Sequence, residues 1–584
     1  MAAVAAIVVL LCFALGYRFY ARFVGERIYG DTDEGVVMPA QALRDDRDYV
    51  PTDPHVLFGH HFTSIAGAAP IIGPCVAAYW GWLPALLWVV LGTIFMGAVH
   101  DFGALVLSVR EGGRSIADVA AKVLGKRARL LFLCFVATVV WLVLAVFAMA
   151  IAGLFVAQPA SVLPIQSEIL LAVIVGWLVY RKKVPALWPS VIALVVLYVL
   201  VWVGTEVPID LAAMGVSDPH TAWILILFAY SAIASLLPVW LLLQPRDFIN
   251  SHQLMVGLAL LFAGLFIAHP ELDAPAVRMD EESPPLFPLL FVTIACGAIS
   301  GFHGLVSSGT TSKQLSELRH ARLIGYGAML GEGTLALAST LAAVAGIALV
   351  GACELPSHGA VADLSWGTYY DSWAHAGANK ATAFVLGGGA FLESTGLPTE
   401  LARTVMAVLV ISFAATTLDT ATRIQRFIVA ELGEAVGVSW LKRPTVATAI
   451  AVLPAVALCF GETTDAMGQS KQVGWVLWPI FGASNQMLAA LTLMVLALYF
   501  AARKKPVLPI VIPMLLVTGV ALLALLAKLE EFLAIGDDLL TGVTVALLAL
   551  VVWMLTEGAM ALRRRPSDAA ADDVQEDVDQ HAGD

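Results

Sequence analysis

One segment of this 584-residue chain reads FGHHFTSIAGAAPIIGP and spans residues 58–74. It lies in an apolar run long enough to cross a membrane, but prolines and small residues crowd its middle. Pro70 removes a backbone donor, and its ring clashes with the preceding turn. We therefore predict that the helix unwinds around 66–70, where it would line a cavity or be buried in protein. The alternative is a proline kink that neighbouring helices satisfy.

The composition places this segment in a polytopic membrane protein. Hydrophobic residues make up 59% of the chain and charged residues 13%, and the mean hydropathy is +0.85. A soluble domain cannot cover that much apolar surface, whereas a bilayer accepts it at about 20 residues per crossing. We predict an all-α transmembrane helix bundle with about 15 spans.

The basic residues orient these spans. With the N-terminus outside and strict alternation, 28 of the 33 Lys and Arg residues fall on the inner side, as the positive-inside rule requires. The N-terminus is then outside and the C-terminus cytoplasmic. The acidic end, 566–584, is expected to be a disordered cytoplasmic tail.

Two connecting segments are expected to be more than linkers. Ser115 stands three residues before Asp118 and predicts a capped helix on the inner membrane surface. The outer stretch 351–399 is long for a compact bundle and contains three successive glycines, Gly387 to Gly389. We interpret it as a lid over the outer face.

The interrupted segment is the first candidate for a substrate site. Ser64, Ala66, Gly67 and Pro70 lie at its expected break, and free amides near Gly67 would attract an anion such as pyruvate. His60 and His61 open the segment as candidates for a proton relay or gate. A pair bonded to backbone carbonyls at the helix entry is the equally weighted alternative.

A second interrupted segment is expected at 220–243, where Ser231 and Ser235 precede Pro238. Two interrupted helices of opposite orientation indicate an inverted-repeat transporter. Farther on, His303, Ser307 and Ser308 are spaced to share a helix face and are further substrate-binding candidates. Simple helix packing with hydroxyls bonded back to the chain is the alternative.

Three carboxylates inside apolar segments are candidates for proton or cation coupling, because intramembrane charges are costly and usually functional. Asp101 is deep enough to accept a proton, and Glu332 is a second candidate. Asp419 is one turn from Arg423, so a structural ion pair is its favoured interpretation. Asn485 and Gln486 are expected to join helices.

The chain resembles the carbon starvation protein A family. The resemblance rests on residues 56–74, 237–247, 291–311, 325–330, 419–426 and 478–488. It implies a bacterial inner-membrane importer of pyruvate or small peptides, coupled to protons or sodium and related to five-plus-five inverted-repeat transporters. The family pattern has glutamine before the Asp-Phe pair, where this chain has His100.

The expected organisation follows from these spans. We expect an extra N-terminal helix at 1–24, a cytoplasmic loop at 25–55, a first repeat at 56–204, a second repeat at 220–422, and accessory helices at 444–562. A channel or a membrane-embedded nutrient sensor is the alternative function. No catalytic triad, nucleotide loop or metal motif is evident, so we expect no enzyme, cofactor, metal or nucleic-acid partner. The scattered cysteines form no disulfide framework.

Overall fold

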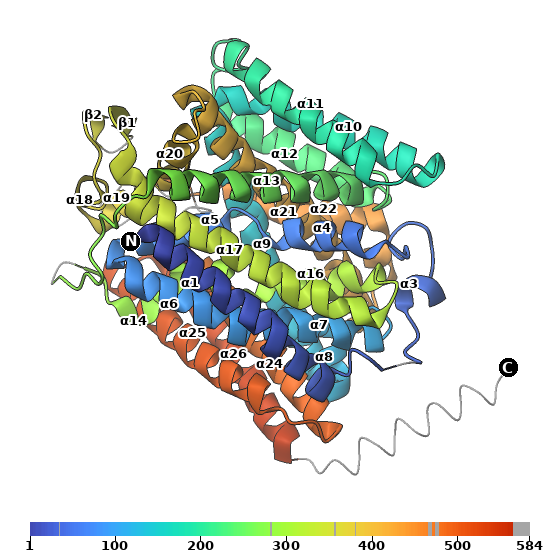
Figure 1. The fold of residues 1–584 in the computed structure, drawn as a ribbon. Coiled ribbons are helices and arrows are strands. Elements are labelled where there is room, and N and C mark those ends of the chain that lie inside the picture. Colours follow the sequence, from blue (N-terminus) through green and yellow to red (C-terminus); the bar gives the residue numbers. More distant parts are fainter. Residues whose placement is uncertain are drawn as a thin grey trace, which may run out of the picture.

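The computed structural model describes residues 1–33, 35–280, 283–355, 358–379, 381–464, 470–472 and 478–563. The acidic tail predicted at 566–584 lies outside these residues. Figure 1 shows a bundle of helices whose axes run broadly alongside one another. The all-α fold class is confirmed, since the described strands form just two short hairpins.

Twelve helices among the described residues are long and apolar enough to cross a membrane, or thirteen if one bent pair counts as a span. The prediction of about 15 therefore exceeds this count. The twelve are Ala2–Tyr29, Trp82–Arg110, Lys126–Ala157, Pro159–Arg181, Leu187–Glu206, Pro219–Leu236, Leu243–Ala268, Leu318–Leu349, Thr399–Ala435, Ile480–Ala502, Leu508–Ile535 and Asp538–Ala561.

The difference has a physical cause in the shorter segments. The predicted span 286–308 is broken into three pieces, α14 (Leu286–Thr293), α15 (Ala295–Ala298) and α16 (Gly301–Gly309). Helix α22 (Pro444–Phe460) is apolar but just 17 residues long. Hydropathy alone does not report whether an apolar run is one straight helix.

The other elements carry the labels of Figure 1. The first half contains α1 (Ala2–Leu15), α2 (Arg22–Val24), α3 (Pro39–Ala42), α4 (Pro54–Ile65), α5 (Ala69–Ala77), α6 (Trp82–Gly92), α7 (Ala98–Arg110), α8 (Ile116–Leu124), α9 (Lys126–Ala157), α10 (Val162–Gly176), α11 (Leu187–Glu206), α12 (Pro219–Leu236) and α13 (Leu243–Ala268). The second half adds β1 (Cys353–Leu355), β2 (Gly359–Val361), α17 (Ala328–Leu341), α18 (Trp366–Tyr369), α19 (Trp373–Asn379), α20 (Thr382–Glu393), α21 (Thr399–Ala435), β3 (Glu462–Thr464), β4 (Ser470–Gln472), α24 (Trp478–Ala502), α25 (Leu508–Ile535) and α26 (Asp538–Arg563).

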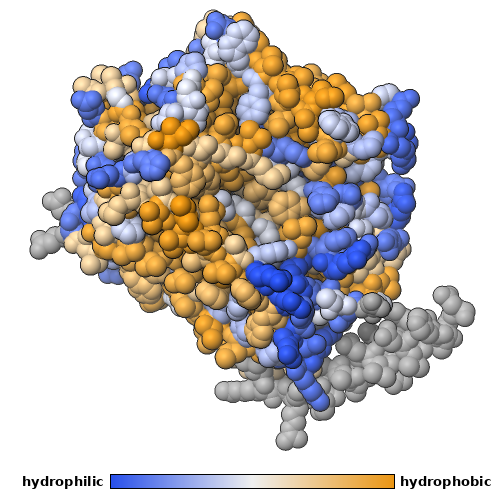
Figure 2. Space-filling model, viewed as in Figure 1, coloured by the Kyte–Doolittle hydropathy of each residue, from blue (hydrophilic) through white to orange (hydrophobic). Residues whose placement is uncertain are grey.

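The surface matches a membrane environment. Figure 2 shows a broad apolar face between hydrophilic side chains gathered toward the two ends of the bundle. The exposed side chains of the protein include large apolar ones, such as those of Leu11 and Leu515. Lipid accepts such side chains without the cost that water would impose.

The structure contains the helix predicted at Ser115, and it shows regular structure in the long stretch 351–399. Helix α8 has the predicted cap, because the Ser115 hydroxyl accepts a hydrogen bond from the Asp118 amide at 3.1 Å. The stretch 351–399 is more structured than a loop. It contains the β1–β2 hairpin, two short helices and the apolar helix α20, in which Gly387 to Gly389 are buried.

Candidate functional site

The first broken helix is confirmed. Helix α4 ends at Ile65 and α5 begins at Ala69, with a bend of 46° between the two pieces. Asp53 caps α4 by accepting from the His55 amide at 2.9 Å. Pro70 stands in the first turn of α5, where its missing N–H costs nothing. Proline thus begins the second half-helix and separates it from the first.

The backbone freed at this break is partly bonded within the protein. Free amides were expected near Gly67; the amide of Gly67 itself donates to the Ile65 carbonyl at 2.8 Å and is not free. Helix α21 packs against the break, and its Thr417 hydroxyl donates to the Ser64 carbonyl at 3.3 Å. A Cβ on Gly67 would lie 2.7 Å from Thr417 Oγ1, which leaves room for glycine alone.

The second break was predicted in the wrong helix. Helix α12 is continuous through Ser231 and Ser235, and Pro238 follows its end at Leu236, so proline terminates this span. The actual break is at Ile299 and Ser300, between α15 and α16. Its signal was the glycine at Gly301, which permits close packing.

Asn485 of α24 completes this second break. Its Oδ1 accepts from the Phe302 amide at 2.9 Å, and its Nδ2 donates to the Ser300 hydroxyl at 2.9 Å. The side chain therefore caps the half-helix α16. The prediction that Asn485 joins helices is confirmed, and Gln486 does the same through the Phe291 carbonyl at 2.6 Å.

The two broken segments run antiparallel against each other. Near one end, His61 Nδ1 lies 2.9 Å from the Thr311 hydroxyl. Toward the other end, a Cβ on Gly73 would lie 2.3 Å from the Thr293 carbonyl oxygen. Residue numbers thus rise along one segment as they fall along the other. Close approach at Gly73 requires glycine.

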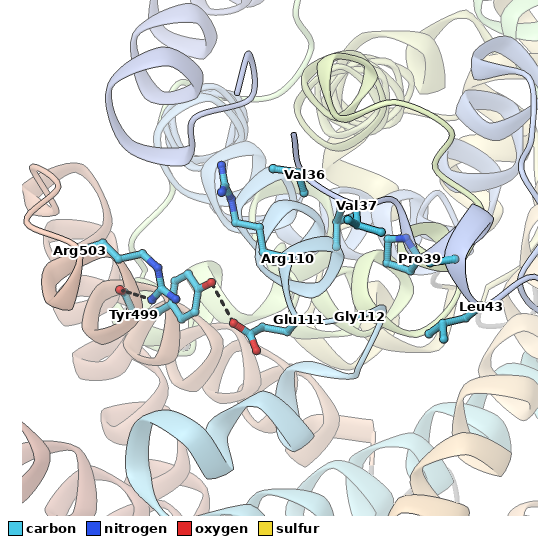
Figure 3. Close-up of a pocket in the computed structure, with 11 residues that line it drawn as sticks. Val36, Val37, Pro39, Leu43, Arg110, Glu111, Gly112, Tyr499 and Arg503 are labelled. Atoms are coloured by element: carbon cyan, nitrogen blue, oxygen red, sulfur yellow. Dashed lines mark hydrogen bonds between the residues drawn. The ribbon is translucent and has the colours of Figure 1, made fainter. Parts of the chain in front are cut away.

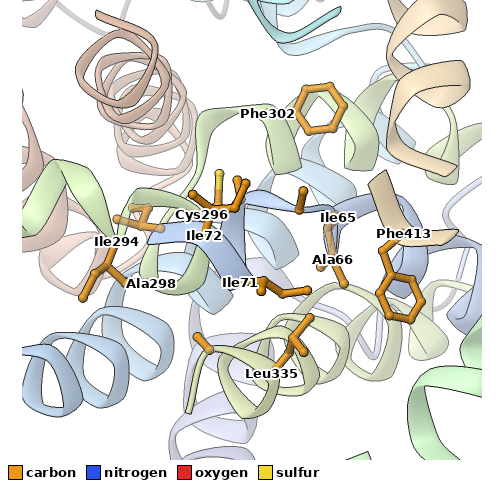
Figure 4. Close-up of a cluster of buried hydrophobic side chains, with 14 of the residues drawn as sticks. Ile65, Ala66, Ile71, Ile72, Ile294, Cys296, Ala298, Phe302, Leu335 and Phe413 are labelled. Atoms are coloured by element: carbon orange, nitrogen blue, oxygen red, sulfur yellow. The ribbon is translucent and has the colours of Figure 1, made fainter. Parts of the chain in front are cut away.

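Apolar side chains fill the space around the breaks. Figure 4 shows Ile65 and Ala66 at the first break near Cys296 and Phe302 of the second segment, with Phe413 beside them. All five are buried. The centre of the bundle is therefore closed by apolar groups in this conformation.

The neighbouring histidines of α4 point to different partners. His60 Nδ1 is 2.6 Å from Asp247 Oδ2 on α13, and His61 Nδ1 is 2.9 Å from the Thr311 hydroxyl. These side-chain partners contradict the alternative in which the pair bonds to backbone carbonyls. Successive residues diverge by about 100° around a helix, so the two imidazoles of α4 face different polar surroundings, and two polar regions lie around this helix.

We call the first polar region the imidazole–carboxylate cluster; it comprises His100, Asp101, His303 and Glu332. His100 Nδ1 is 2.7 Å from Asp101 Oδ1, and His303 Nδ1 is 3.1 Å from Asp101 Oδ2. The other nitrogen of His303 is 3.3 Å from Glu332 Oε2, close but not aligned for a hydrogen bond. All four side chains are essentially inaccessible. The structure thus brings together three of the predicted residues.

We call the second region the arginine–carboxylate cluster; it comprises Tyr230, Arg246, Asp247 and Asp419. The Arg246 guanidinium donates to both Asp419 oxygens, to Asp247 Oδ1 at 2.7 Å and to the Tyr230 hydroxyl at 2.7 Å. Tyr230 in turn donates to Asp419 Oδ2 at 2.9 Å.

The expected pairing of Asp419 with Arg423 is therefore wrong. Arg423 instead donates to Asp48 at 2.5 Å. Helical spacing places Arg423 one turn from Asp419, but Arg246 arrives from α13 with a bidentate geometry that is stronger. Arg246 lies in the first turn of α13, which begins at Leu243.

The four candidate serines differ in their hydrogen-bond partners. Ser231 and Ser235 donate back to carbonyls of their own helix, at 3.2 and 2.9 Å. Ser308 donates to Gly304 and accepts from the Ile116 amide at 3.2 Å, so it joins α16 to α8. Ser307 is buried, and its hydroxyl has no hydrogen-bond partner among the described residues. The alternative of back-bonded hydroxyls, raised for Ser307 and Ser308, thus holds for Ser308 and not for Ser307.

Sequence reasoning missed several polar partners. Tyr230, Asp247 and Thr311 carry no motif, because each is brought to the site by a helix distant in sequence. The available signal was the adjacent charge pair Arg246 and Asp247, which follows an apolar run directly. To place that pair inside a membrane helix, one would have needed to know that α13 begins at Leu243.

A latch of charged groups closes the end of the bundle where α4 begins. Asp48 binds Arg423 and Arg426, at 2.5 and 3.2 Å. Burial disfavours the charged form of Asp48, but the two arginines and Lys313 outweigh it and lower the pKa of this carboxyl. Burial lowers the pKa of the Lys313 ammonium to about 8, and Lys313 Nζ stands 3.6 Å from the Phe427 ring centroid.

Three cavities lie near α5, the start of α4 and the arginine–carboxylate cluster. One of about 500 Å³ reaches Ala69, Ile72 and Gly73 of α5 and is lined on its far side by Trp373 and Lys528. Another of about 860 Å³ lies beside the start of α4, at His55 and Phe58. A small cavity of about 30 Å³, room for about one water, adjoins Glu168, Tyr230 and Arg246.

A further surface pocket of about 570 Å³ contains none of the residues of the two clusters. Figure 3 shows Arg110, Glu111, Tyr499 and Arg503 around it, with the Tyr499 hydroxyl donating to Glu111 at 2.9 Å. Its charged rim fits a surface groove better than a membrane-embedded site.

The fold and the buried clusters define a multi-pass membrane protein whose core contains antiparallel broken helices. The chain belongs to the family described as carbon starvation protein CstA, whose model matches residues 1–524.

Characterised relatives are similar over most of their length. The Mycobacterium tuberculosis (strain ATCC 25618 / H37Rv) protein named peptide transporter CstA is 33% identical over 544 residues, covering 83% of this chain and 69% of that protein. The Escherichia coli (strain K12) pyruvate/proton symporter BtsT is 32% identical over 552 residues, with coverage of 82% and 75%. A solved manganese transporter of Eremococcus coleocola matches with a TM-score of 0.42 at 12% identity, covering 89% of this chain and 99% of that one.

Proposed function

We propose that this protein is a bacterial inner-membrane secondary transporter that imports pyruvate or small peptides together with a cation, most simply a proton. Family membership supports the transport function. The names of its relatives support the two substrate classes, peptides and pyruvate. The observation that carries the proposal is Asp101, buried between two imidazoles beside a broken helix.

Proton exchange is the chemistry that the imidazole–carboxylate cluster suits. Two carboxylates and two imidazoles can hold different numbers of protons while each added charge keeps an opposite partner nearby. His303 lies between Asp101 and Glu332, so a proton gained by one carboxylate changes the electrostatic environment of the other. In our proposal Asp101 is the coupling acid, while His61 relays the change to α4. His60 and Asp419 transmit it through the arginine–carboxylate cluster.

Substrate binding is proposed at the break of α4 and α5. The first turn of α5, from Ala69, presents the positive end of a helix. The cavity of about 500 Å³ beside Trp373 and Lys528, which we call the outer cavity, reaches this turn. Ser64, Ala66, Gly67 and Pro70 would border the substrate carboxylate, and the unpartnered hydroxyl of Ser307 is a further candidate. The back-bonded Ser231 and Ser235 and the capping Ser308 are weaker ones.

Alternating access would then open one side of the breaks at a time. The latch formed by Asp48, Arg423 and Arg426 would close the inner side, and the outer cavity would admit substrate. The inward placement of the latch rests on the charge-derived orientation, with the N-terminus outside and the C-terminus cytoplasmic.

The repeat organisation is also a proposal. The antiparallel pair α4–α5 and α14–α16 supports a five-plus-five core whose second repeat starts at α14 and not at residue 220. Helices α10 and α11 stand at the edge of the bundle in Figure 1, and we propose that they are an insertion in the first repeat. The helix 1–24 and the helices near the C-terminus would be accessory.

Reconstitution tests the transport proposal. Purified protein in liposomes should accumulate labelled pyruvate above equilibrium under an inward proton gradient, and a protonophore should abolish the accumulation. Competition by unlabelled dipeptides would show that peptides share the site. No accumulation under a proton or a sodium gradient, for pyruvate or a labelled dipeptide, would overturn the proposal.

Two variants of the cluster test the coupling role. Asp101→Asn removes the proton acceptor and should leave gradient-independent exchange while losing accumulation. His100→Gln keeps a hydrogen-bond donor to Asp101 but cannot titrate, so accumulation should persist with a shifted pH profile. Unchanged pH-dependent accumulation in Asp101→Asn would refute Asp101 as the coupling acid.

A further inference from the structure

The outer segment 351–399 carries a cluster of metal-ligating side chains that the transport proposal does not use. It comprises His358, in the turn between β1 and β2, Asp371, just before α19, and His375, on α19. Figure 1 shows β1, β2, α18 and α19 gathered at one end of the bundle, near the N-terminus. The sequence suggested no metal site here because His358 is 13 residues from Asp371.

The three side chains converge at ligand distances. His358 Nε2 is 2.9 Å from Asp371 Oδ2, His375 Nδ1 is 2.6 Å from Asp371 Oδ1, and one ligand atom from each lies within 4.8 Å of the others. Ligand atoms of a tetrahedral zinc site stand about 3.3 Å apart, given bonds of about 2.0–2.1 Å. The observed separations, from 2.6 Å to at most 4.8 Å, bracket that spacing.

Two of the three ligands are held in place by the bundle. The Tyr370 hydroxyl donates to the Cys75 carbonyl at 2.6 Å, and Arg278 donates to the Tyr370 carbonyl at 2.5 Å. The backbone next to Asp371 is therefore fixed. The Trp373 ring of α19 packs on Trp80, with centroids 4.8 Å apart, which orients the helix that carries His375.

We propose that His358, Asp371 and His375 bind a divalent transition metal, with zinc as the reference ion. Two imidazoles and a carboxylate match zinc, while magnesium and calcium prefer oxygen ligands alone. The side chains are 18%, 43% and 34% exposed, so the ion can enter from solvent and keep a water as its fourth ligand. Both imidazoles bind as neutral rings, and any proton on them is released to solvent.

The metal would tie the β1–β2 hairpin to α19. Trp373 and Gly377 of α19 line the outer cavity that leads to α5. Zinc binding would therefore make the wall of this cavity more rigid. This consequence follows from the position of the site and does not require the transported substrate to be known.

Zinc binding to the full chain, purified without a polyhistidine tag, tests the proposal. Isothermal titration should show one high-affinity site per chain, and His358→Ala and Asp371→Asn should each weaken it at least tenfold. His269→Ala is the matched control, because His269 is also exposed, at the end of α13, and belongs to no cluster. This control should bind zinc like the native protein.

Hydrogen exchange tests independently whether zinc links the β1–β2 hairpin to α19. Zinc should slow exchange in residues 353–361 and 373–379 of the native protein and leave His358→Ala unchanged. The three residues are partly exposed, so their substitution should preserve the fold, which the unfolding midpoint without zinc would verify. Native-like zinc affinity in both variants, or no high-affinity site in the native protein, would overturn the proposal.

Discussion

Asp419 depends on Arg246 for its charge balance, so removing this arginine should destabilise the protein strongly. The Arg246 side chain is 3% exposed and both of its carboxylate partners are fully buried. Arg246→Met leaves two buried carboxylates without their arginine, and breaking a buried pair in this way costs about 3–5 kcal/mol. Asp419→Asn costs less, about 1.5–3 kcal/mol, because Arg246 keeps Asp247 at 2.7 Å.

The double variant separates a direct pair from two independent effects. In Arg246→Met with Asp419→Asn, one carboxylate is neutralised along with the cation, so the total loss should fall below the sum of the single losses by about 0.5–3 kcal/mol. The free energy of unfolding is measured by denaturation in mixed micelles for the native protein, the two single variants and the double variant. If Arg246→Met does not fold, Arg246→Lys replaces it, because lysine retains the charge and loses the bidentate fork.

A second double-mutant cycle serves as the control and pairs Asp419 with Arg423, the partner that helical spacing favours. Arg423 bonds to Asp48 in the structure, so the coupling between Arg423→Met and Asp419→Asn should be the smaller of the two. A coupling to Arg423 that equals or exceeds the coupling to Arg246 would refute the assignment of the pair.

Three further predictions concern the break and the latch. Gly67→Ala should cost about 1–3 kcal/mol through overpacking on Thr417 and slow uptake in liposomes, whereas adding Thr417→Ala should recover both; no recovery would exclude this contact as the cause. The pKa of Lys313 is lowered to about 8, below the value of about 10.4 in an unfolded chain. The unfolded state therefore binds more protons between these values, so stability should rise with pH across that window, and the rise should be absent in Lys313→Met. Asp48→Asn should release Arg423 and speed hydrogen exchange in residues 44–53, and unchanged exchange would show that the latch is held by other contacts.

The transmembrane character and the first break could be predicted from the sequence because both depend on local composition. Apolar runs of about 20 residues have no other favourable environment, and Pro70 cannot continue a helix without losing a hydrogen bond. The cap on α8 is equally local, since Ser115 and Asp118 are within one turn.

The partners of the buried charges were decided by the tertiary structure. Asp419 has Arg423 one helical turn away, yet it binds Arg246 from a helix more than 170 residues earlier in the chain. The second break was misplaced for a related reason. Pro238 ends a helix, whereas Ile299 and Ser300 interrupt one without proline, because Asn485 from α24 supplies the capping bonds.

The same distinction between local sequence and tertiary packing applies to the candidate sites. Residue type and depth were sufficient to select Asp101, Glu332 and His303, because an ionisable group inside an apolar run is costly wherever it ends up. Which of these groups touch, and that His358, Asp371 and His375 meet at one end of the bundle, depends on how helices distant in sequence pack. Local sequence specifies which groups need a partner, and long-range packing determines which partner is within reach.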